Sequence, residues 1–588
     1  MNLEEAFSKE NIIIVLCNLR MACAGKRHEK HFLHNIAKER YNEPKVIEKL
    51  DQQYEDIKNL YSMLPPRRLW NHKRPKPQKR KGKVGAEVDG IALRLTVLER
   101  LKNPQPGDQK WVDNLNNFIN EVQSRVLRTP PYKMATPKIL PVEKDPEKKD
   151  GKYRPIAKYT DLCDQVVDKL CAKYFRTIFD SIFLDSSYAF RAKGQNSRCP
   201  THHDAVEHLI QFRQTNSEKT LWVAECDIKK FFDCVHHNEA KAALNRLKER
   251  TGYEIDPRAE EIFKAYLDSY SFPRDALTQA NQWFDKYNLK GKLDWCENDL
   301  REIWKDPLQE PIGIPQGGAL SCFIVNLMLD LADRAVISNS EQCDPDLLYL
   351  RYCDDIIIVH PDKEKCNKAF ERYSEALKSL KLVRHEPEKL TSYGKDFWNH
   401  KSKEPYKWAY EPNGSSVPWV AFVGYQLRYD GLLRIRPSSI KKELKKQFKE
   451  ANKILKAVCP RSKNKTGRMV EYSPNIRINR HRIYHRLHQR LISMSVGRIK
   501  LEDLDKEPST FCWCDGFKLL RSHKPVLYSQ LKQLDRGRES QLKRVKKKIK
   551  YLEVRDNSQG DKSKYYKYYG HPFSYYAQFF DKPNSPSY

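Results

Sequence analysis

The chain has 588 residues, with 108 Lys and Arg against 77 Asp and Glu, which gives a formal net charge of +31 at pH 7. Hydrophobic residues make up 39% of the chain and aromatic residues 11%, which excludes a wholly disordered protein because this content can build a sizeable core. The longest apolar run near the N-terminus covers only residues 12–17. This run is too short for a membrane span or a signal peptide, so we expect a cytoplasmic protein without a membrane partner.

The surplus of positive charge favours a polyanionic partner. Nucleic acid is favoured over anionic lipid, because basic residues run through the whole chain rather than along one amphipathic segment. The 15 cysteines include no Cys-x-x-Cys pair. We therefore expect reduced thiols and no zinc site built on cysteine.

Two segments precede the central part of the chain. Residues 1–64 are expected to form a helical extension, because apolar residues recur at helical spacing among charged ones. Residues 65–85 contain nine Lys or Arg and no acidic residue. This composition predicts a proline-rich linker or an extended basic arm that contacts phosphates, with a solvated loop as the alternative.

Residues 86–435 alternate between helix and strand patterns. The segment 221–228 is a short apolar run that predicts a strand, and 347–352 with 356–360 predict a hairpin around a tight turn. A helix is predicted over 320–335, with these residues on one face: Leu320, Ile324, Leu327, Leu331 and Ala335. The mixture indicates the α+β class.

Basic helices are predicted after residue 435. We expect one helical unit over 436–500 and an extension over 501–588 that ends in a tyrosine-rich tail. The first unit carries basic residues that recur among Ile and Leu and are candidates for nucleic-acid contacts: Arg477, Arg480, Arg482, Arg486 and Arg490.

Three carboxylates are the candidate catalytic residues. Asp227 ends the strand predicted over 221–228, and Asp354 with Asp355 occupies the predicted hairpin turn. Adjacent carboxylates repel each other when both are ionised, and a bound cation relieves this repulsion. Hard oxygen ligands suit Mg²⁺, and two such ions stabilise the attacking and leaving oxygens of phosphoryl transfer. Alone, Asp354-Asp355 would be an ordinary turn dipeptide.

Several motifs nevertheless occur together, and in one order. Tyr352-Cys353-Asp354-Asp355 resembles the YxDD box of reverse transcriptases. Further segments resemble other motifs of that family: KDGKYRPI (149–156), SSYAFRAKGQ (186–195), AECDIKKFFDCVHH (224–237), GIPQGGALSCFIVNLMLD (313–330) and FVGYQLRYDGLLRIR (422–436). The segments DIKKFFD and RYCDD resemble the corresponding segments of bacterial enzymes from group II introns, retrons and phage defence. Cys353 and Ala189 depart from the pattern of the intron enzymes. The long extensions fit the defence-associated group best.

The resemblance implies a right-hand polymerase fold. Fingers and palm would occupy 86–435 and a basic helical thumb 436–500, with helical N- and C-terminal extensions. Two Mg²⁺ ions would be held by Asp227, Asp354, Asp355 and the Ile228 carbonyl. The incoming dNTP would contact residues that match the family's nucleotide-binding motifs: Lys152, Arg154, Phe232, Gln316 and Gly317.

The implied activity is RNA-directed DNA synthesis. The expected partners are an RNA template, in the defence group a dedicated non-coding RNA, the DNA product and dNTPs, and a homo-oligomer stays open. An RNA-binding maturase or scaffold with the same fold is the main alternative, and a template-independent polymerase is another. A third is protein priming by a hydroxyl of the tail, for which Tyr588 is the candidate.

Overall fold

The computed structural model describes most of the chain, and the account below concerns the described residues only. They are 1–37, 55–74, 85–127, 131–144, 151–191, 199–337, 344–388, 397, 400–409, 419–458, 461–463, 469–471, 483–484, 487–488, 490–491 and 524–555. The chain divides into two compact units, of which the first holds residues 1–15, 116–423 and 427–431 and the second holds the remainder. No helix among the described residues has the length and apolar character needed to cross a membrane.

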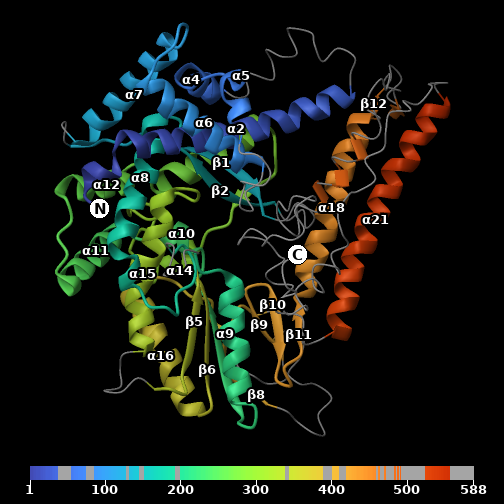
Figure 1. Cartoon of the computed structure of the whole chain (residues 1–588). Helices are drawn as coiled ribbons and strands as arrows, with labels where there is room; N and C mark the ends of the chain where they lie inside the picture. The colour runs from blue at the N-terminus through green and yellow to red at the C-terminus, as the bar shows by residue number, and fades with distance from the viewer. Residues whose placement is uncertain are drawn as a thin grey trace, which may run out of the picture. The chain divides into compact units, whose positions relative to one another are not determined.

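A five-stranded sheet lies at the centre of the first unit (Figure 1). Its strands, in spatial order, are β5 (Leu348–Tyr352), β6 (Asp355–His360), β3 (Leu221–Asp227), β8 (Ser402–Trp408) and β7 (Pro387–Glu388). β3 pairs antiparallel with both β6 and β8, so it is a central strand. Its side chains are buried at five of seven positions, and all of these except Glu225 are apolar. This is expected for a strand that is covered on both faces. The strand and the hairpin expected here are confirmed.

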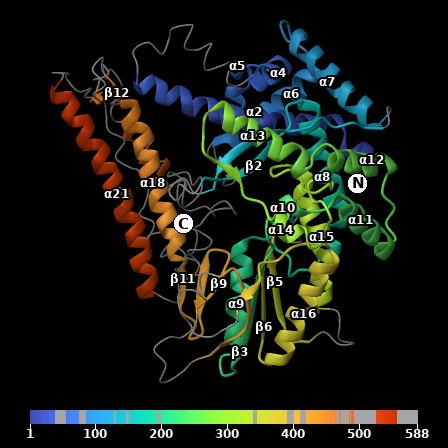
Figure 2. The same ribbon diagram turned by 180° about the vertical axis from the view of Figure 1, so that it is seen from behind.

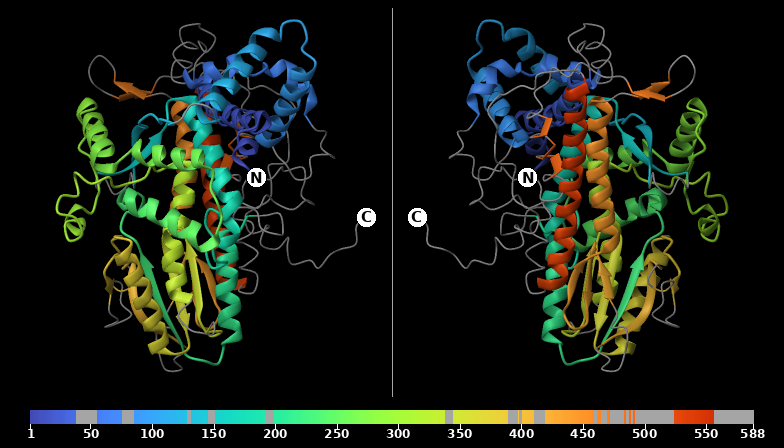
Figure 3. Two further views of the ribbon diagram at one scale, coloured as in Figure 1. Left: turned by 90° about the vertical axis from the view of Figure 1, so that its left-hand side faces the viewer. Right: turned by 90° about the vertical axis from the view of Figure 1, so that its right-hand side faces the viewer.

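Helices cover this sheet on both sides. In Figures 1 and 3, α16 (Lys363–Ser379) lies on one side of the sheet and α9 (His202–Thr215) on the other. α15 (Ala319–Ile337) packs against α16 and against α8 (Leu162–Phe179), where Phe175 stacks on Phe323 with ring centroids 5.1 Å apart. The helix expected over 320–335 is therefore confirmed. The expected apolar face was only partly right, because Leu331 is 37% exposed while α15 is buried on the other sides.

A smaller sheet holds the segment that carries Lys152 and Arg154. Its strands, in spatial order, are β1 (Lys138–Glu143), β2 (Lys152–Lys158) and β4 (Lys292–Leu293). β2 pairs antiparallel with β1 and parallel with β4. An apolar cluster joins this sheet to α13 (Thr278–Lys286) and to the π-helical segment Phe272–Leu277 (Figure 2).

The remaining elements of the first unit are short or link the sheets. They are α1 (Leu3–Ala6), η4 (Asp180–Ile182), α10 (Phe231–Cys234), α11 (His237–Thr251), α12 (Pro257–Asp268) and α14 (Glu297–Leu300). Two helices, α2 (Lys9–Ala37) and α7 (Gln109–Leu127), contribute residues to both units. The strands β9 (Trp419–Phe422), β10 (Tyr425–Arg428) and β11 (Leu433–Ile435) lie where the chain passes from the first unit to the second.

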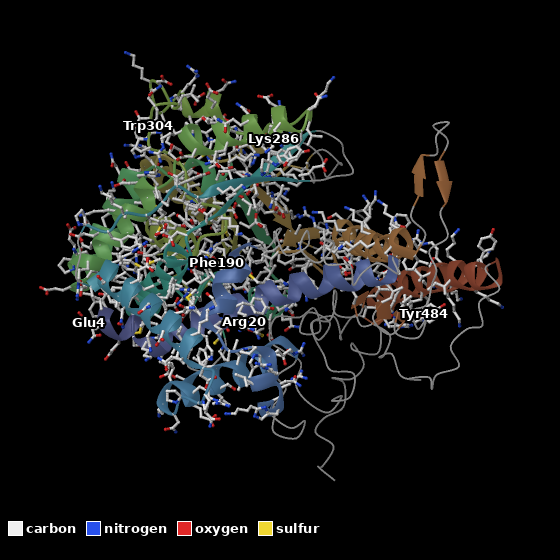
Figure 4. All side chains as sticks on the ribbon, turned by 90° about the horizontal axis from the view of Figure 1, so that it is seen from above. Glu4, Arg20, Phe190, Lys286, Trp304 and Tyr484 are labelled. Atoms are coloured by element: carbon white, nitrogen blue, oxygen red, sulfur yellow. The ribbon has the colours of Figure 1, made fainter. Side chains whose placement is uncertain are left out.

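The first fifteen residues belong to the first unit and not to a separate extension. Leu3 and Phe7 are fully buried, and the Phe7 carbonyl accepts a hydrogen bond from Gln123 at 3.0 Å. Glu4, labelled in Figure 4, pairs with Arg258 of α12. Helices α1, α2 (Lys9–Ala37) and α4 (Glu55–Met63) form most of the described residues of 1–64, and residues 1–15 pack with the central part of the chain.

The second unit contains two long basic helices, α18 (Pro437–Val458) and α21 (Lys524–Arg555), which run side by side (Figure 3). They share an apolar cluster that includes Ile454 and Val545. Gly537 lies at their contact, where an added Cβ would come within 2.7 Å of the Gln447 side-chain oxygen. The expected boundary at residue 500 therefore does not separate two units, because α21 packs on α18.

The other elements of the second unit are α4 (Glu55–Met63), α5 (Arg67–Trp70), η2 (Asn71–Lys73), α6 (Gly85–Lys102), β12 (Arg461–Lys463) and β13 (Met469–Glu471). The expected arm at 65–85 is not extended at its start, since 67–73 is helical and packs on α6. Arg74 forms an ion pair with Asp89 at 2.7 Å, so part of the positive charge of the 65–85 segment is neutralised within the protein. Residues 75–84 lie outside the described residues.

A buried ion pair lies under the β5–β6 hairpin. Arg351 on β5 and Asp333 on α15 are both 0% exposed, and the shortest distance between their charged groups is 2.6 Å. Asp333 also accepts from the Tyr349 hydroxyl at 2.6 Å, and Arg351 donates to the Asn326 side-chain oxygen at 3.1 Å. A fully buried charge needs such complete pairing, because loss of one partner leaves the other without solvation.

We expect Arg351→Leu to lower the free energy of unfolding by about 3–5 kcal/mol, because it leaves Asp333 buried without its cation. Asp333→Leu should have an effect of similar size. The two changes should not add, and the double variant should show a coupling of at least about 1 kcal/mol. Urea denaturation of the four proteins measures this, and strict additivity would contradict the coupling.

Candidate active site

The β5–β6 hairpin presents Asp354 at a tight two-residue turn. Tyr352 pairs with Asp355 in the antiparallel register, so Cys353 and Asp354 alone form the turn. Cys353 has φ 62°, a left-handed conformation that costs a non-glycine residue about 1–2 kcal/mol. The Cys353 carbonyl accepts from the Arg351 guanidinium at 3.1 Å, which ties this turn to the buried ion pair below it.

Asp227 lies beside this turn because of the strand register. β3 pairs with β6 so that Asp227 is directly opposite Asp355, and all three carboxylates meet at one end of the sheet. Asp354 is half-buried and Asp355 is exposed. Burial and the nearby Asp227 charge raise the pKa of the Asp354 carboxyl above its ordinary value. The structure thus brings together the three acids predicted from the sequence.

Two basic side chains that the sequence did not indicate also reach Asp227. Lys401 forms an ion pair with the Asp227 carboxylate, and the His385 Nε2 atom lies 3.6 Å from the same oxygen. Burial and the Lys401 charge lower the pKa of His385 below its ordinary value. Both residues lie more than 150 positions along the chain from Asp227, on segments next to β8, so no local motif marks them.

The acids fit a magnesium site in their chemistry. Within the described ranges, no three His, Cys, Asp or Glu side chains form a complete ligand set by themselves. Mg²⁺ needs no such cage, because it keeps several waters and is bound through one or two carboxylates plus substrate phosphates. Asp227 and Asp354 supply the carboxylates, and Ile228 follows Asp227 at the end of β3.

Phe232 lies on α10, directly after the turn that follows β3. Phe231–Cys234 is a short helix that starts after Lys230, whose backbone is in the left-handed conformation with φ 49°. Phe231 is buried in the core and meets Phe232 edge-on, with ring centroids 5.7 Å apart. Phe232 itself is half-buried. Phe231 therefore packs in the core, while its neighbour Phe232 stays partly accessible.

Gln316 and Gly317 lie in a loop that is held from two sides. The Gln316 side-chain amide donates to Asp233 at 2.7 Å, and the Gln316 carbonyl accepts from the Ala157 N–H of β2 at 2.9 Å. Gly317 has φ +118°, which side chains rarely allow. The loop therefore places Gln316 between α10 and β2.

The helix after this loop is anchored by a second buried acid. The Asp168 carboxylate on α8 accepts from the Ala319 and Leu320 N–H groups, at 2.8 and 2.9 Å, and so caps the start of α15. Burial raises the pKa of Asp168 above its ordinary value. Gly318 must lack a side chain, because a Cβ there would collide with the Tyr266 hydroxyl.

Lys152 and Arg154 lie two residues apart on β2, so they project from the same face of the strand. The Lys152 ammonium is 3.8 Å from the Asp294 carboxylate. Arg154 is exposed, and its charge acts on Asp233, the residue that holds Gln316. The structure thus places both predicted phosphate-binding residues near the Gln316 loop.

The remaining predicted residues are only partly described. Arg490 is on the surface and pairs with Glu450 of α18 at 3.3 Å. Tyr588 and four of the five predicted arginines lie outside the described residues: Arg477, Arg480, Arg482 and Arg486.

Residues 146–408 match the reverse transcriptase (RNA-dependent DNA polymerase) family. They form a reverse transcriptase domain. All predicted metal and dNTP residues, from Lys152 to Asp355, fall within it. The domain is of the RNA-directed DNA polymerase class, whose chemistry is nucleotidyl transfer, and it confirms the expected α+β polymerase fold.

Other similarities are distant. Protein YkfC of Escherichia coli (strain K12) is 22% identical over 239 residues, which cover 36% of this chain and 52% of YkfC. The chain thus spans about half the length of this curated relative. Apo telomerase of Candida tropicalis aligns with a TM-score of 0.33 and 12% identity, over 84% of this chain and 79% of that one. Telomerase of Candida albicans, in complex with a fragment of telomeric RNA, aligns with a TM-score of 0.32 and 12% identity, over 83% of this chain and 70% of that one. The domain assignment rests on the family match.

Asp233 is a further acid of the site. It is buried on α10 and holds Gln316, while its carbonyl accepts from the Trp295 indole at 3.0 Å. Burial raises the pKa of Asp233 to about 6, although the Gln316 hydrogen bond and the charges of nearby basic side chains act in the opposite direction. The signal for this residue is present in the segment DIKKFFD, but the sequence alone gave it no role.

We expect the effect of Asp233→Asn on stability to depend on pH. The carboxyl pKa in the folded state lies above its ordinary value near 4, so the folded protein binds the extra proton below about pH 6 and loses that stabilisation as the pH rises from about 4 to 6. Asn cannot titrate, so the stability of the variant relative to wild type should rise over this range by roughly 2–3 kcal/mol. Thermal unfolding of both proteins at a series of pH values measures this. A difference that is constant with pH would contradict it.

Proposed function

We propose that the chain is an RNA-directed DNA polymerase that extends a primer by two-metal nucleotidyl transfer. The observation that carries this proposal is the register of β3 on β6, which sets Asp227 opposite Asp355 and beside Asp354 within a reverse transcriptase domain. A protein that only bound RNA would not need these acids at one end of the sheet together with the Gln316 loop and Phe232.

Each residue of the site has a task in this reaction. Asp227, Asp354 and the Ile228 carbonyl would hold Mg²⁺, with Asp355 beside them. Bound Mg²⁺ would supply charge stabilisation to the primer oxygen and the leaving pyrophosphate. Burial and the Asp227 charge raise the pKa of Asp354, and a bound cation would offset this cost of ionising the two acids side by side.

The nucleotide would be bound by the surfaces around these acids. Arg154 and Lys152 on β2 are suited to the triphosphate, since a guanidinium binds phosphate oxygens in pairs. Gln316, fixed by Asp233 and by β2, would lie against the nucleotide. The primer 3′-hydroxyl then attacks the α-phosphate and pyrophosphate leaves, so catalysis consists mainly of positioning and electrostatic stabilisation.

The finer parts of the proposal rest on the sequence. We infer a cytoplasmic enzyme of antiphage defence that copies a dedicated non-coding RNA into DNA. This inference is supported by the segments DIKKFFD and RYCDD and by the long extensions of the chain. The basic helices α18 and α21 supply positive charge for binding the template–primer duplex. Sequencing of nucleic acids that co-purify with the chain tests the template, since a diverse RNA pool would argue against a dedicated one.

We expect Asp227→Asn and Asp354→Asn each to reduce dNTP incorporation at least 1000-fold on an RNA template, while RNA binding changes less than threefold. Asn keeps the shape of the side chain but removes the charge that holds a metal. Asp346→Asn is the matched control, because Asp346 forms a surface ion pair with Lys219 in the same domain. Primer extension and filter binding measure the two properties. Full incorporation by either site variant would contradict the assignment and favour the scaffold alternative.

We expect Phe232→Ala to admit ribonucleotides. The half-buried ring would exclude a 2′-hydroxyl by its bulk, so its removal should raise the use of rNTP relative to dNTP by at least tenfold. Phe232→Tyr keeps the ring and should preserve the selection of dNTP. Single-nucleotide extension with each sugar measures the ratio. An unchanged ratio in the Ala variant would place the selection elsewhere.

A further inference from the structure

Three lysines surround one carboxylate beside the site. The ammonium groups of Lys230, Lys144 and Lys152 lie 2.6, 3.5 and 3.8 Å from the same oxygen of Asp294. The four residues come from different parts of the fold, because Lys144 follows β1, Lys152 begins β2, Lys230 follows β3 and Asp294 follows β4. We call these residues the lysine cluster.

The backbone around the lysine cluster is closely held. The Lys144 N–H donates to the Lys152 carbonyl at 2.9 Å, and β4 pairs with β2 so that Lys292 lies opposite Lys152. Lys230 is in the left-handed conformation, which costs a lysine free energy that a glycine would avoid. This strained turn carries a side chain that ends on Asp294, so a function for that side chain would account for the lysine at this position.

The lysine cluster has surplus positive charge in partly buried surroundings. Three ammonium groups face one carboxylate, and Lys144, Lys230 and Asp294 are each exposed by about a third or less. Burial and the neighbouring Lys230 lower the pKa of Lys144 to about 8, against the opposing effects of Asp294 and Asp233. Ammonium groups that are held together against their repulsion form a ready site for a polyanion.

The lysine cluster is also next to the nucleotide-binding residues. The charges of Lys144, Lys230 and Arg154 all act on Asp233, which holds Gln316. Phe232 and Asp233 are consecutive on α10, two and three residues after Lys230. A nucleotide that lies against Gln316 and Phe232 would therefore have its phosphates close to these ammonium groups.

We propose that Lys144 and Lys230 join Lys152 in binding the terminal phosphates of the incoming nucleotide, and that Asp294 is the positioning residue that gathers them. This inference rests on the proposed function and deepens it, because it adds two phosphate-binding residues and their organiser to the same site. Asp294 holds the three ammonium groups together at one carboxylate oxygen.

The first experiment compares two neighbouring lysines on the full chain. Lys230→Met should raise the KM for dNTP about tenfold with kcat changed less than threefold. Lys229→Met is the matched control, because it removes the same charge one residue away, where Lys229 pairs with Asp299 at 2.9 Å. Its KM should change less than twofold. Equal changes in KM for both variants would overturn the proposal, because they would show a general charge effect.

The second experiment tests Asp294 through pH. In wild type, KM for dNTP should rise as the pH passes about 8, where Lys144 loses its proton. Groups that face Lys144 are Lys230, Asp294 and Asp233; the two carboxylates favour the charged form of Lys144, and Asp294 has the larger effect of the two. Asp294→Asn should therefore raise KM at least threefold at pH 7.5 and shift the rise in KM to lower pH. A KM profile identical to wild type would overturn the positioning role.

The third experiment separates this inference from the proposed function. Inorganic tripolyphosphate is titrated into the Asp354→Asn protein, which keeps the lysine cluster, and into the same protein with Lys230→Met. Binding that weakens at least fivefold in the second protein supports the inference even if no incorporation is ever observed. Equal binding in both overturns the inference, and it leaves the polymerase proposal to be judged by incorporation in wild type.

Discussion

The position of the turn that carries Asp354 depends on the buried pair of Arg351 and Asp333. A guanidinium with no solvent contact must have all its charge and hydrogen bonds satisfied by fixed partners. These partners are Asp333 and Asn326 on α15 and the Cys353 carbonyl in the turn itself. The turn that carries Asp354 is therefore held by a helix beneath it, and the strained Cys353 backbone is tolerated because the surrounding contacts fix it.

The same helix connects the two halves of the site. α15 begins directly after the Gln316 loop, where Asp168 binds its first N–H groups, and it carries Asp333 some fourteen residues further on. The turn that carries Asp354 and the Gln316 loop are thus both held by α15. Carboxylates lie at the end of the sheet, and lysines lie near α10. This arrangement of opposite charges suits a substrate that carries both a metal ion and phosphates.

The sequence predicted the parts of the site that lie close together in the chain. The hairpin of 347–360, the strand that ends in Asp227 and the helix after Gln316 were visible, because each has a local pattern of apolar residues next to a polar motif. Lys401, His385 and Asp294 were not visible, because their contacts are set by strand pairing and by segments that lie between the motifs. The short helix that carries Phe232 was not predicted, since four residues are too few to show a period. Leu331 was assigned to a buried face, because periodicity alone does not tell which side of a helix other elements cover.

The burial of residues 1–15 in the first unit has a practical consequence. An expression fragment cut at the limits of the family match, residues 146–408, would omit Leu3 and Phe7 and so uncover the part of α8 against which α1 packs. Such a fragment would aggregate for a reason unrelated to its chemistry. A soluble minimal domain needs the first helices supplied, either on the same chain or as a separate peptide that restores the missing wall of the core.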